Sequence, residues 1–235
     1  MAGYKNNIDR LEIIASGLKE FNEQSIFIGG ACTQFYVTNP ELRDYRPTRD
    51  IDCFIKISSY TQYAHLSERL RELGFSHDTS ENAPIIRWIF KAIPVDIIPE
   101  ESAIVGFREI PWLKEGRSYA IKKGLPSGVE INILPLSYFL ATKLEASKDR
   151  GKSDYLADHD IEDIINIIDG NYTLAEILEA PLNVKSSIIQ SFSVLLKDIN
   201  FKRSISGHIG FETSAAERAK EIVDKMTRLL QADTE

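Results

Sequence analysis

The sequence predicts an α/β protein of the α+β type, with a mixed β-sheet flanked by helices in its N-terminal part and a helical bundle in its C-terminal part. Short apolar runs bounded by Gly, Pro and Asp, such as Ile26–Ile28 and Pro94–Ile98, predict strands before residue 135. After Pro135 the apolar residues recur at helical spacing. A chain of 235 residues has room for two domains. We therefore expect one domain over residues 1–134 and a second over residues 135–235.

The composition indicates a soluble protein that does not coat nucleic acid. Hydrophobic residues make up 43% of the chain and charged residues 27%, which is ordinary for a globular protein. The net charge of −7 argues against extended, non-specific nucleic-acid binding, which needs many cations. We see no signal peptide, and no apolar run approaches the ~18 residues of a membrane span. Cys32 and Cys53 form neither a disulfide framework nor a zinc motif. We expect a cytoplasmic protein without a membrane partner.

The elements of the N-terminal part follow from periodicity and from the positions of Gly and Pro. Apolar residues at helical spacing predict helices over about residues 8–22 and 60–73, and a helical segment over 31–37. Apolar runs and alternation predict strands over residues 25–28, 50–56, 85–91, 94–98 and 129–134. The strands 85–91 and 94–98 are close enough in sequence to be joined by a tight turn around Ala92-Ile93.

A glycine pair, Gly29 and Gly30, ends the first strand and precedes a helical segment. A strand, glycines and a helix in this order can present free backbone N–H groups to an anion at the positive end of the helix. A glycine pair by itself is more often only a turn. Its meaning therefore depends on the residues that follow.

Two carboxylates, Asp50 and Asp52, open the next predicted strand. Alternation places both on one face of that strand, roughly 6.5–7 Å apart at Cα, so their oxygens can converge on one cation. Asp96 interrupts the apolar strand IPVDIIP and would be a third carboxylate. An Asp in such a strand is costly unless it faces a cation or hydrogen-bond donors. The alternative for each is an edge strand that turns its Asp to solvent.

The C-terminal part predicts a bundle with an inward-facing lysine. Lys143 falls on the apolar stripe of the helix that begins at Leu136, so it must pair, reach the surface or meet an anion. In the next helix, expected over residues 155–169, Asp160 lies beside the apolar stripe and Asp163 nearer the solvent side. Further helices are expected over residues 172–180, 183–197 and 213–231, and a glycine-containing loop over 201–211.

Four segments together resemble the nucleotidyltransferase superfamily, and more narrowly the AbiEii/AbiGii-type branch of type IV toxin–antitoxin and abortive-infection toxins. They are GG at residues 29–30, TRDID at 48–52, PVDIIPE at 94–100 and FLATKLEASKDRGKSDYLADHDIEDI at 139–164. The resemblance spans roughly residues 25–169.

The resemblance implies a role for each candidate residue. Gly29 and Gly30 would hold the triphosphate, although many relatives have Gly-Ser there. Asp50 and Asp52 would bind the metal, with Asp96 as the third carboxylate. The remaining contacts to the nucleotide would come from Arg49, Lys143 and Asp160, with Asp163 as the alternative partner acid of Lys143.

The implied activity is transfer of an NMP from an NTP to an acceptor hydroxyl, with Mg²⁺ or Mn²⁺ as cofactor and release of pyrophosphate. The acceptor would be tRNA or another RNA, or a protein, and an antitoxin protein would be a partner. Two alternatives stay open. One is an antibiotic-type enzyme with a small-molecule acceptor, and the other is a nucleotidyltransferase-like protein that binds a nucleotide or a partner without catalysis.

Overall fold

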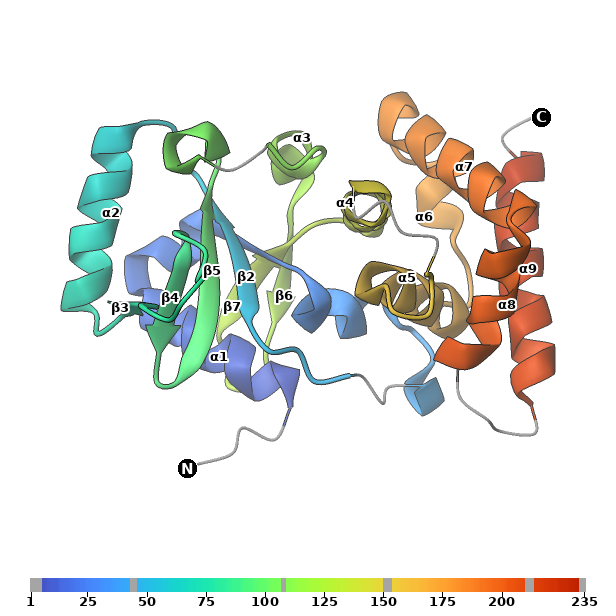
Figure 1. The fold of residues 1–235 in the computed structure, drawn as a ribbon, viewed down its shortest axis with the longest axis horizontal. Helices are drawn as coiled ribbons and strands as arrows, with labels where there is room; N and C mark the ends of the chain where they lie inside the picture. Colours follow the sequence, from blue (N-terminus) through green and yellow to red (C-terminus); the bar gives the residue numbers. More distant parts are fainter. Residues whose placement is uncertain (1–5, 43–45, 107–108, 150–153, 210–213, 233–235) are drawn as a thin grey trace. The chain divides into compact units, whose positions relative to one another are not determined.

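The computed structural model describes residues 6–42, 46–106, 109–149, 154–209 and 214–232 (Figure 1). The chain forms two compact units, one of residues 1–32 and 46–135 and the other of residues 33–45 and 136–235. The segment that follows Cys32 thus belongs to the helical unit. The prediction that residues 1–134 and 135–235 are separate domains stays a prediction.

The first unit is built on a mixed sheet, as predicted. Its seven strands are β1 (Ser25–Ile28), β2 (Ile51–Ile55), β3 (Ser76–His77), β4 (Arg87–Phe90), β5 (Ile93–Pro99), β6 (Ile121–Gly124) and β7 (Glu130–Ile133). Their order is β3-β4-β5-β2-β1-β7-β6. The pairs β1–β7 and β2–β5 are parallel, and the other neighbours are antiparallel. The two strands at the sheet edges, β3 and β6, were not predicted, because β3 has two residues and β6 is exposed along its whole length.

Short helices accompany the sheet. They are α1 (Asn7–Leu18), η1 (Lys19–Gln24), α2 (Tyr60–Glu72), η4 (Ser102–Val105), α3 (Leu113–Gly116) and η5 (Arg117–Tyr119). The side chain of Asn6 caps α1, and Leu11, Ile14 and Leu18 are fully buried. α1 contacts β2 and β5. It therefore covers the sheet face that carries Ile51 and Cys53, both fully buried in β2.

The helix predicted over residues 8–22 is confirmed in type but ends earlier as an α-helix. Lys19 has a φ of 51°, and the chain continues as the 3-10 segment η1.

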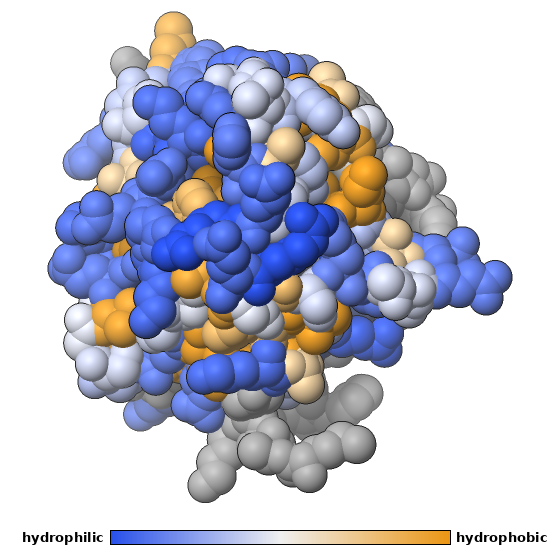
Figure 2. Space-filling view, turned by 90° about the vertical axis from the view of Figure 1, so that its left-hand side faces the viewer, coloured by the Kyte–Doolittle hydropathy of each residue, from blue (hydrophilic) through white to orange (hydrophobic). Residues whose placement is uncertain are grey.

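The surface on the side of α2 is mostly hydrophilic, with apolar residues in small patches (Figure 2).

The second unit is helical, as predicted. Its elements are η3 (Pro40–Leu42), α4 (Leu136–Asp149), α5 (His159–Gly170), α6 (Ala175–Leu178), α7 (Leu182–Lys197), α8 (Ile199–His208) and α9 (Ala215–Ala232). η2 (Gly30–Tyr36) leads into this unit from the first. Backbone N–H groups of Thr38 and Asn39 donate to the carbonyl of Gly170, at 2.9 and 2.8 Å. These bonds explain why residues 33–45 count with the helices rather than with the sheet.

The structure corrects predicted elements of this unit. α5 begins at His159 rather than at residue 155, because the Asp158 side chain accepts from the N–H groups of Asp160 and Ile161 and so caps the helix there. Most of the loop predicted over 201–211 is helix α8, capped by Asp198. Gly207 lies inside α8, where a Cβ would lie 2.4 Å from Cδ2 of Leu156. This glycine makes room for a leucine and does not mark a loop; residues 210 and 211 lie outside the described part.

No helix within the described ranges combines the length and the apolar character that a membrane crossing requires.

Candidate active site

Two of the predicted carboxylates lie next to each other on neighbouring strands. Asp52 of β2 and Asp96 of β5 are partners in the parallel register. Neighbouring strands lie about 4.8 Å apart and paired residues face the same side, so both carboxylates emerge on the sheet face opposite Ile51 and Cys53. Asp96 is 8% exposed. The sheet register therefore brings together two residues that are 44 positions apart in the sequence.

A glycine is required at position 29, because the backbone there lies close to the side chain of Asp52. Gly29 follows β1, where Ile28 pairs with Asp52, and it has a φ of 73°. A Cβ on Gly29 would lie 1.9 Å from Oδ2 of Asp52. The glycine thus both adopts the left-handed conformation and leaves space for the carboxylate. Gly30 begins the 3-10 helix η2. Binding of a triphosphate by both glycines stays a prediction.

Asp50 precedes β2 and is joined to Asp96 by an arginine outside the predicted set. Arg87 donates from Nε and Nη2 to the two carboxylate oxygens of Asp96, at 2.7 and 2.8 Å. The same Nη2 donates to Oδ2 of Asp50 at 2.7 Å. The hydrogen bond to Asp96 raises the pKa of Arg87 above its ordinary value, and the charges of Asp50 and Asp52 act in the same direction. All three carboxylates therefore act on one guanidinium.

The register of the β4–β5 hairpin explains why Arg87 was missed. Its turn lies at Lys91-Ala92, one residue earlier than predicted, and both residues have positive φ, 47° and 64°. Such turns are usually marked by Asn-Gly or Asp-Gly, and neither pair stands at this turn. With the observed turn, Phe90 pairs with Ile93 and Arg87 with Asp96. The spacing between Arg87 and Asp96 would have revealed this pair if the turn had been placed correctly.

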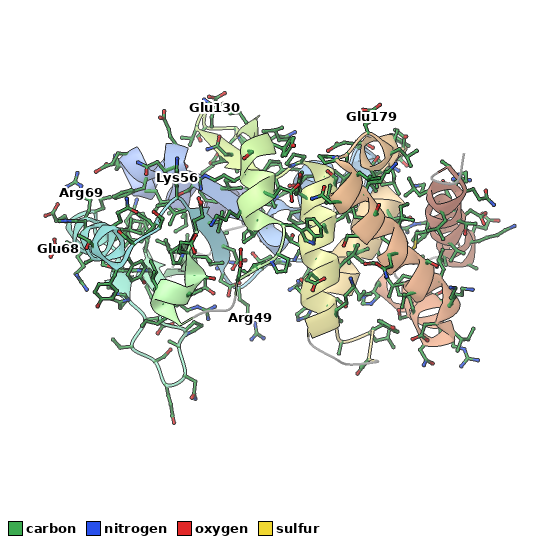
Figure 3. The ribbon with its side chains drawn as sticks, turned by 90° about the horizontal axis from the view of Figure 1, so that it is seen from above. Arg49, Lys56, Glu68, Arg69, Glu130 and Glu179 are labelled. Atoms are coloured by element: carbon green, nitrogen blue, oxygen red, sulfur yellow. The ribbon has the colours of Figure 1, made fainter. Side chains whose placement is uncertain are left out.

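The loop before β2 is held by side chains of α1. Oδ1 of Asn7 accepts from the backbone N–H of Thr48 at 3.0 Å, and Nδ2 of Asn7 donates to the carbonyl of Arg46 at 3.2 Å. Arg10 donates to the carbonyls of Thr48 and Arg49. These bonds fix the backbone that leads into Asp50. The side chain of Arg49, the predicted phosphate contact, is exposed and points outward (Figure 3).

The carboxylates offer the oxygen donors that Mg²⁺ and Mn²⁺ prefer. Among the residues that the structure describes, no three His, Cys, Asp or Glu side chains are arranged to hold a metal ion together. Mg²⁺ needs fewer protein ligands, since it is usually bound through one or two carboxylates, substrate phosphates and water. Asp50 and Asp52 therefore fit a metal that binds together with a nucleotide. The predicted metal ligands Asp50, Asp52 and Asp96 stay predictions.

A second charged cluster lies inside the helical unit. Nζ of Lys143 donates to Oδ2 of Asp163 at 2.6 Å and to Oδ1 of Asp160 at 3.0 Å. The side chains of all three residues are at most 10% exposed. Burial by itself would lower the pKa of Lys143, but the charges of Asp163 and Asp160 outweigh burial and raise the pKa. Lys143 is therefore a buried ammonium held between two carboxylates of α5.

The structure confirms that Lys143 pairs with Asp160 but corrects the position of Asp163. The helical pattern placed Asp163 nearer the solvent side, which is wrong, whereas the resemblance gave Asp163 as the alternative partner acid of Lys143, and this pairing is present. Asp163 is 5% exposed, because α5 is buried around much of its circumference, with Ile161, Ile164 and Ile167 fully buried. Residues three apart share a helix face, so Asp160 and Asp163 reach Lys143 together. Contact of Lys143 or Asp160 with a nucleotide stays a prediction.

Comparison with known proteins shows the fold. No protein-family model matches the chain, and no curated protein matches it either. Among solved structures, the chain is similar to an antigenic nucleotidyltransferase-like protein from Paracoccidioides brasiliensis, with a TM-score of 0.54 and 15% sequence identity. The match covers 89% of this chain and 95% of that chain. This chain thus has a nucleotidyltransferase-like fold, and the AbiEii/AbiGii-type branch stays a prediction.

Substitution of Gly29 tests its contact with Asp52. We expect Gly29→Ala to lower the free energy of unfolding by about 2–4 kcal/mol, because strain at positive φ and overpacking each cost about 1–3 kcal/mol. Gly106→Ala is the matched control, since Gly106 has a φ of 70° and a Cβ added there would meet nothing within 4 Å. Urea unfolding followed by circular dichroism measures both. Equal losses in the two variants would show that the approach to Asp52 costs nothing.

Removal of the buried ammonium tests the cluster in the helical unit. Lys143→Met leaves two buried carboxylates without their cation, so we expect a loss of about 3–5 kcal/mol in the free energy of unfolding. Lys148→Met removes a half-exposed lysine from the same helix, and we expect a change within about 0.5 kcal/mol. A Lys143→Met protein as stable as the native protein would contradict a buried charged cluster.

Proposed function

We propose that the protein is a metal-dependent nucleotidyltransferase, which transfers an NMP from an NTP to an acceptor hydroxyl and releases pyrophosphate. The observation that carries this proposal is the gathering of Asp50 and Asp52, at the start of β2, with Asp96, in the middle of β5, in a nucleotidyltransferase-like fold. The clustering of carboxylates that are far apart in sequence is expensive, because like charges repel and polar groups lose water. A role in binding cations and phosphates explains why the fold tolerates this cost.

The reaction needs positioning more than covalent chemistry from the protein. The acceptor oxygen forms a bond to the α-phosphorus while the bond from that phosphorus to the bridging oxygen breaks, and pyrophosphate leaves. A bound Mg²⁺ or Mn²⁺ supplies positive charge for the phosphate oxygens. Asp50 and Asp52 would hold it. Asp96 would accept the hydroxyl proton, since each carboxylate oxygen has about two acceptor positions and Arg87 uses one on each.

As the acceptor we propose an RNA end, such as that of a tRNA, and as the biological role a toxin of a toxin–antitoxin pair. The exposed side chain of Arg49, one residue before Asp50, supports an anionic acceptor. The toxin role and the antitoxin partner are supported by the sequence resemblance. A protein hydroxyl or a small molecule as acceptor would be recognised by its labelling in the same assay.

A second candidate function is binding of a nucleotide or partner without transfer. It is favoured by the bonds of Arg87, which use both oxygens of Asp96 and one of Asp50. Binding of NTP with Mg²⁺ and without release of pyrophosphate would support this function.

Incubation with labelled NTPs, total RNA and cell extract tests the proposal. We expect label on RNA and release of pyrophosphate from the native protein, and loss by at least about a hundredfold in Asp52→Asn, because several kcal/mol of charge stabilisation disappear. Glu68→Gln, on the exposed surface of α2, is a control that should keep full activity. Label that persists in Asp52→Asn would refute the assignment. Circular dichroism should show that the fold of this variant is intact.

A further inference from the structure

Arg87 is placed by the sheet against two of the site's acids. It lies opposite Asp96 in the antiparallel pair β4–β5, so both side chains emerge on the same face. Its guanidinium grips both oxygens of Asp96 and extends to Asp50, with three bonds of 2.7–2.8 Å. Bidentate arginine–carboxylate pairs are among the strongest hydrogen-bonded ion pairs and fix geometry as well as charge. Arg87 thus occupies the space between two proposed metal-site acids.

Accessibility distinguishes this cluster from the buried one in the helical unit. The side chains of Arg87 and Asp50 are 25% and 31% exposed, whereas Lys143 and its two acids are at most 10% exposed. A dissolved cation can therefore reach Asp50. Asp50 and Asp96 share this one guanidinium, so their two negative charges exceed its single positive charge, which favours uptake of a divalent cation. The Arg87 cluster is open to exchange of one cation for another.

The same contacts set up a competition. A divalent cation that binds Asp50 or Asp96 shares oxygens with Arg87, and two positive groups at a few Å repel each other. A metal that arrives with a triphosphate brings negative oxygens as well. The fork of N–H donors on an arginine matches phosphate geometry as well as carboxylate geometry, so a displaced Arg87 gains a new partner. Arg87 should therefore oppose the binding of free metal more strongly than the binding of metal together with a nucleotide.

We propose that Arg87 is an internal cation of the carboxylate site. It keeps the affinity of the site for free divalent metal low, and when metal and nucleotide bind together it releases Asp50 and binds a nucleotide phosphate instead. The inference rests on the proposed metal-dependent function. It makes the binding of metal and that of nucleotide positively coupled, so each raises the affinity of the site for the other. Through Arg87, the carboxylate site then binds metal tightly only when the nucleotide is present.

The affinity of the intact protein for Mn²⁺ without nucleotide tests this role. Electron paramagnetic resonance titration measures free Mn²⁺ directly and needs no activity. We expect Arg87→Gln to bind Mn²⁺ at least about tenfold more tightly than the native protein, because a positive charge a few Å away is removed. Arg87→Lys, which keeps the charge, should stay near the native affinity. Arg69→Gln is the matched control: Arg69 also bonds two carboxylates, Glu20 and Glu72, but lies on α2, well away from Arg49, the residue before Asp50 (Figure 3).

Thermal unfolding provides a second readout that separates this role from a merely structural one. Without metal, Arg87→Gln should unfold at a lower temperature than the native protein, because Asp50 and Asp96 lose their cation. Mn²⁺ should restore the unfolding temperature in this variant, since a ligand that binds the native state stabilises it. A purely structural salt bridge would give a loss that Mn²⁺ does not restore.

The coupling itself is measured with a non-hydrolysable NTP. In the native protein we expect this NTP to raise the affinity for Mn²⁺, and in Arg87→Gln we expect the gain to be at least about tenfold smaller, because the charge that opposes free Mn²⁺ is gone. Unchanged or weaker Mn²⁺ binding in Arg87→Gln would overturn the inference, as would the absence of Mn²⁺ binding in both proteins. If Arg87→Gln tightens Mn²⁺ binding but no NMP transfer occurs, the inference stands and the proposed function falls. If NMP transfer occurs but Arg87→Gln does not change Mn²⁺ binding, the proposed function stands and the inference falls.

Discussion

Carboxylates that gather on one face of a sheet must be offset by positive charge, and this constraint organises the first unit. The register of β2 and β5 makes Asp52 and Asp96 neighbours, and Asp50 lies two residues before Asp52. In the described structure Arg87 supplies the positive charge. Gly29 leaves the space that Asp52 needs, and Asn7 with Arg10 holds the loop that leads into Asp50. In the first unit, the sheet register and the loop before β2 thus bring these acids to one guanidinium.

The helical unit solves the same electrostatic problem differently. Lys143, Asp160 and Asp163 form a closed and nearly dry cluster, in which one ammonium meets two carboxylates. The removal of one partner from a pair that is buried to this extent costs several kcal/mol. The Arg87 cluster is instead partly exposed, and the charge of its acids exceeds that of its cation. Open and overcharged sites are suited to binding ions, whereas closed and paired ones are suited to holding helices together.

Much of this arrangement could be predicted from the sequence, and the gaps have physical causes. Alternation and apolar runs predicted the central strands and the acids Asp50, Asp52 and Asp96, because the cost of an Asp among apolar neighbours is a local property. The position of Arg87 depends on a turn without Gly or Asn, so its register could not be counted correctly. Asp163 was misplaced because an amphipathic pattern predicts one buried face, and α5 is buried on more than one. Helix α8 was missed because Gly207 indicates a loop in sequence but makes room for Leu156 in the fold.

The central claim is that the acids around β2 and β5 hold a divalent metal together with an NTP. Anomalous diffraction from crystals grown with Mn²⁺ and a non-hydrolysable NTP tests it most directly. The account predicts an anomalous peak at the oxygens of Asp50 and Asp52, with the nucleotide phosphates on the same ion and Arg87 released from Asp50. Nucleotide bound without Mn²⁺ at these oxygens, or Mn²⁺ bound only at other acids, would contradict it.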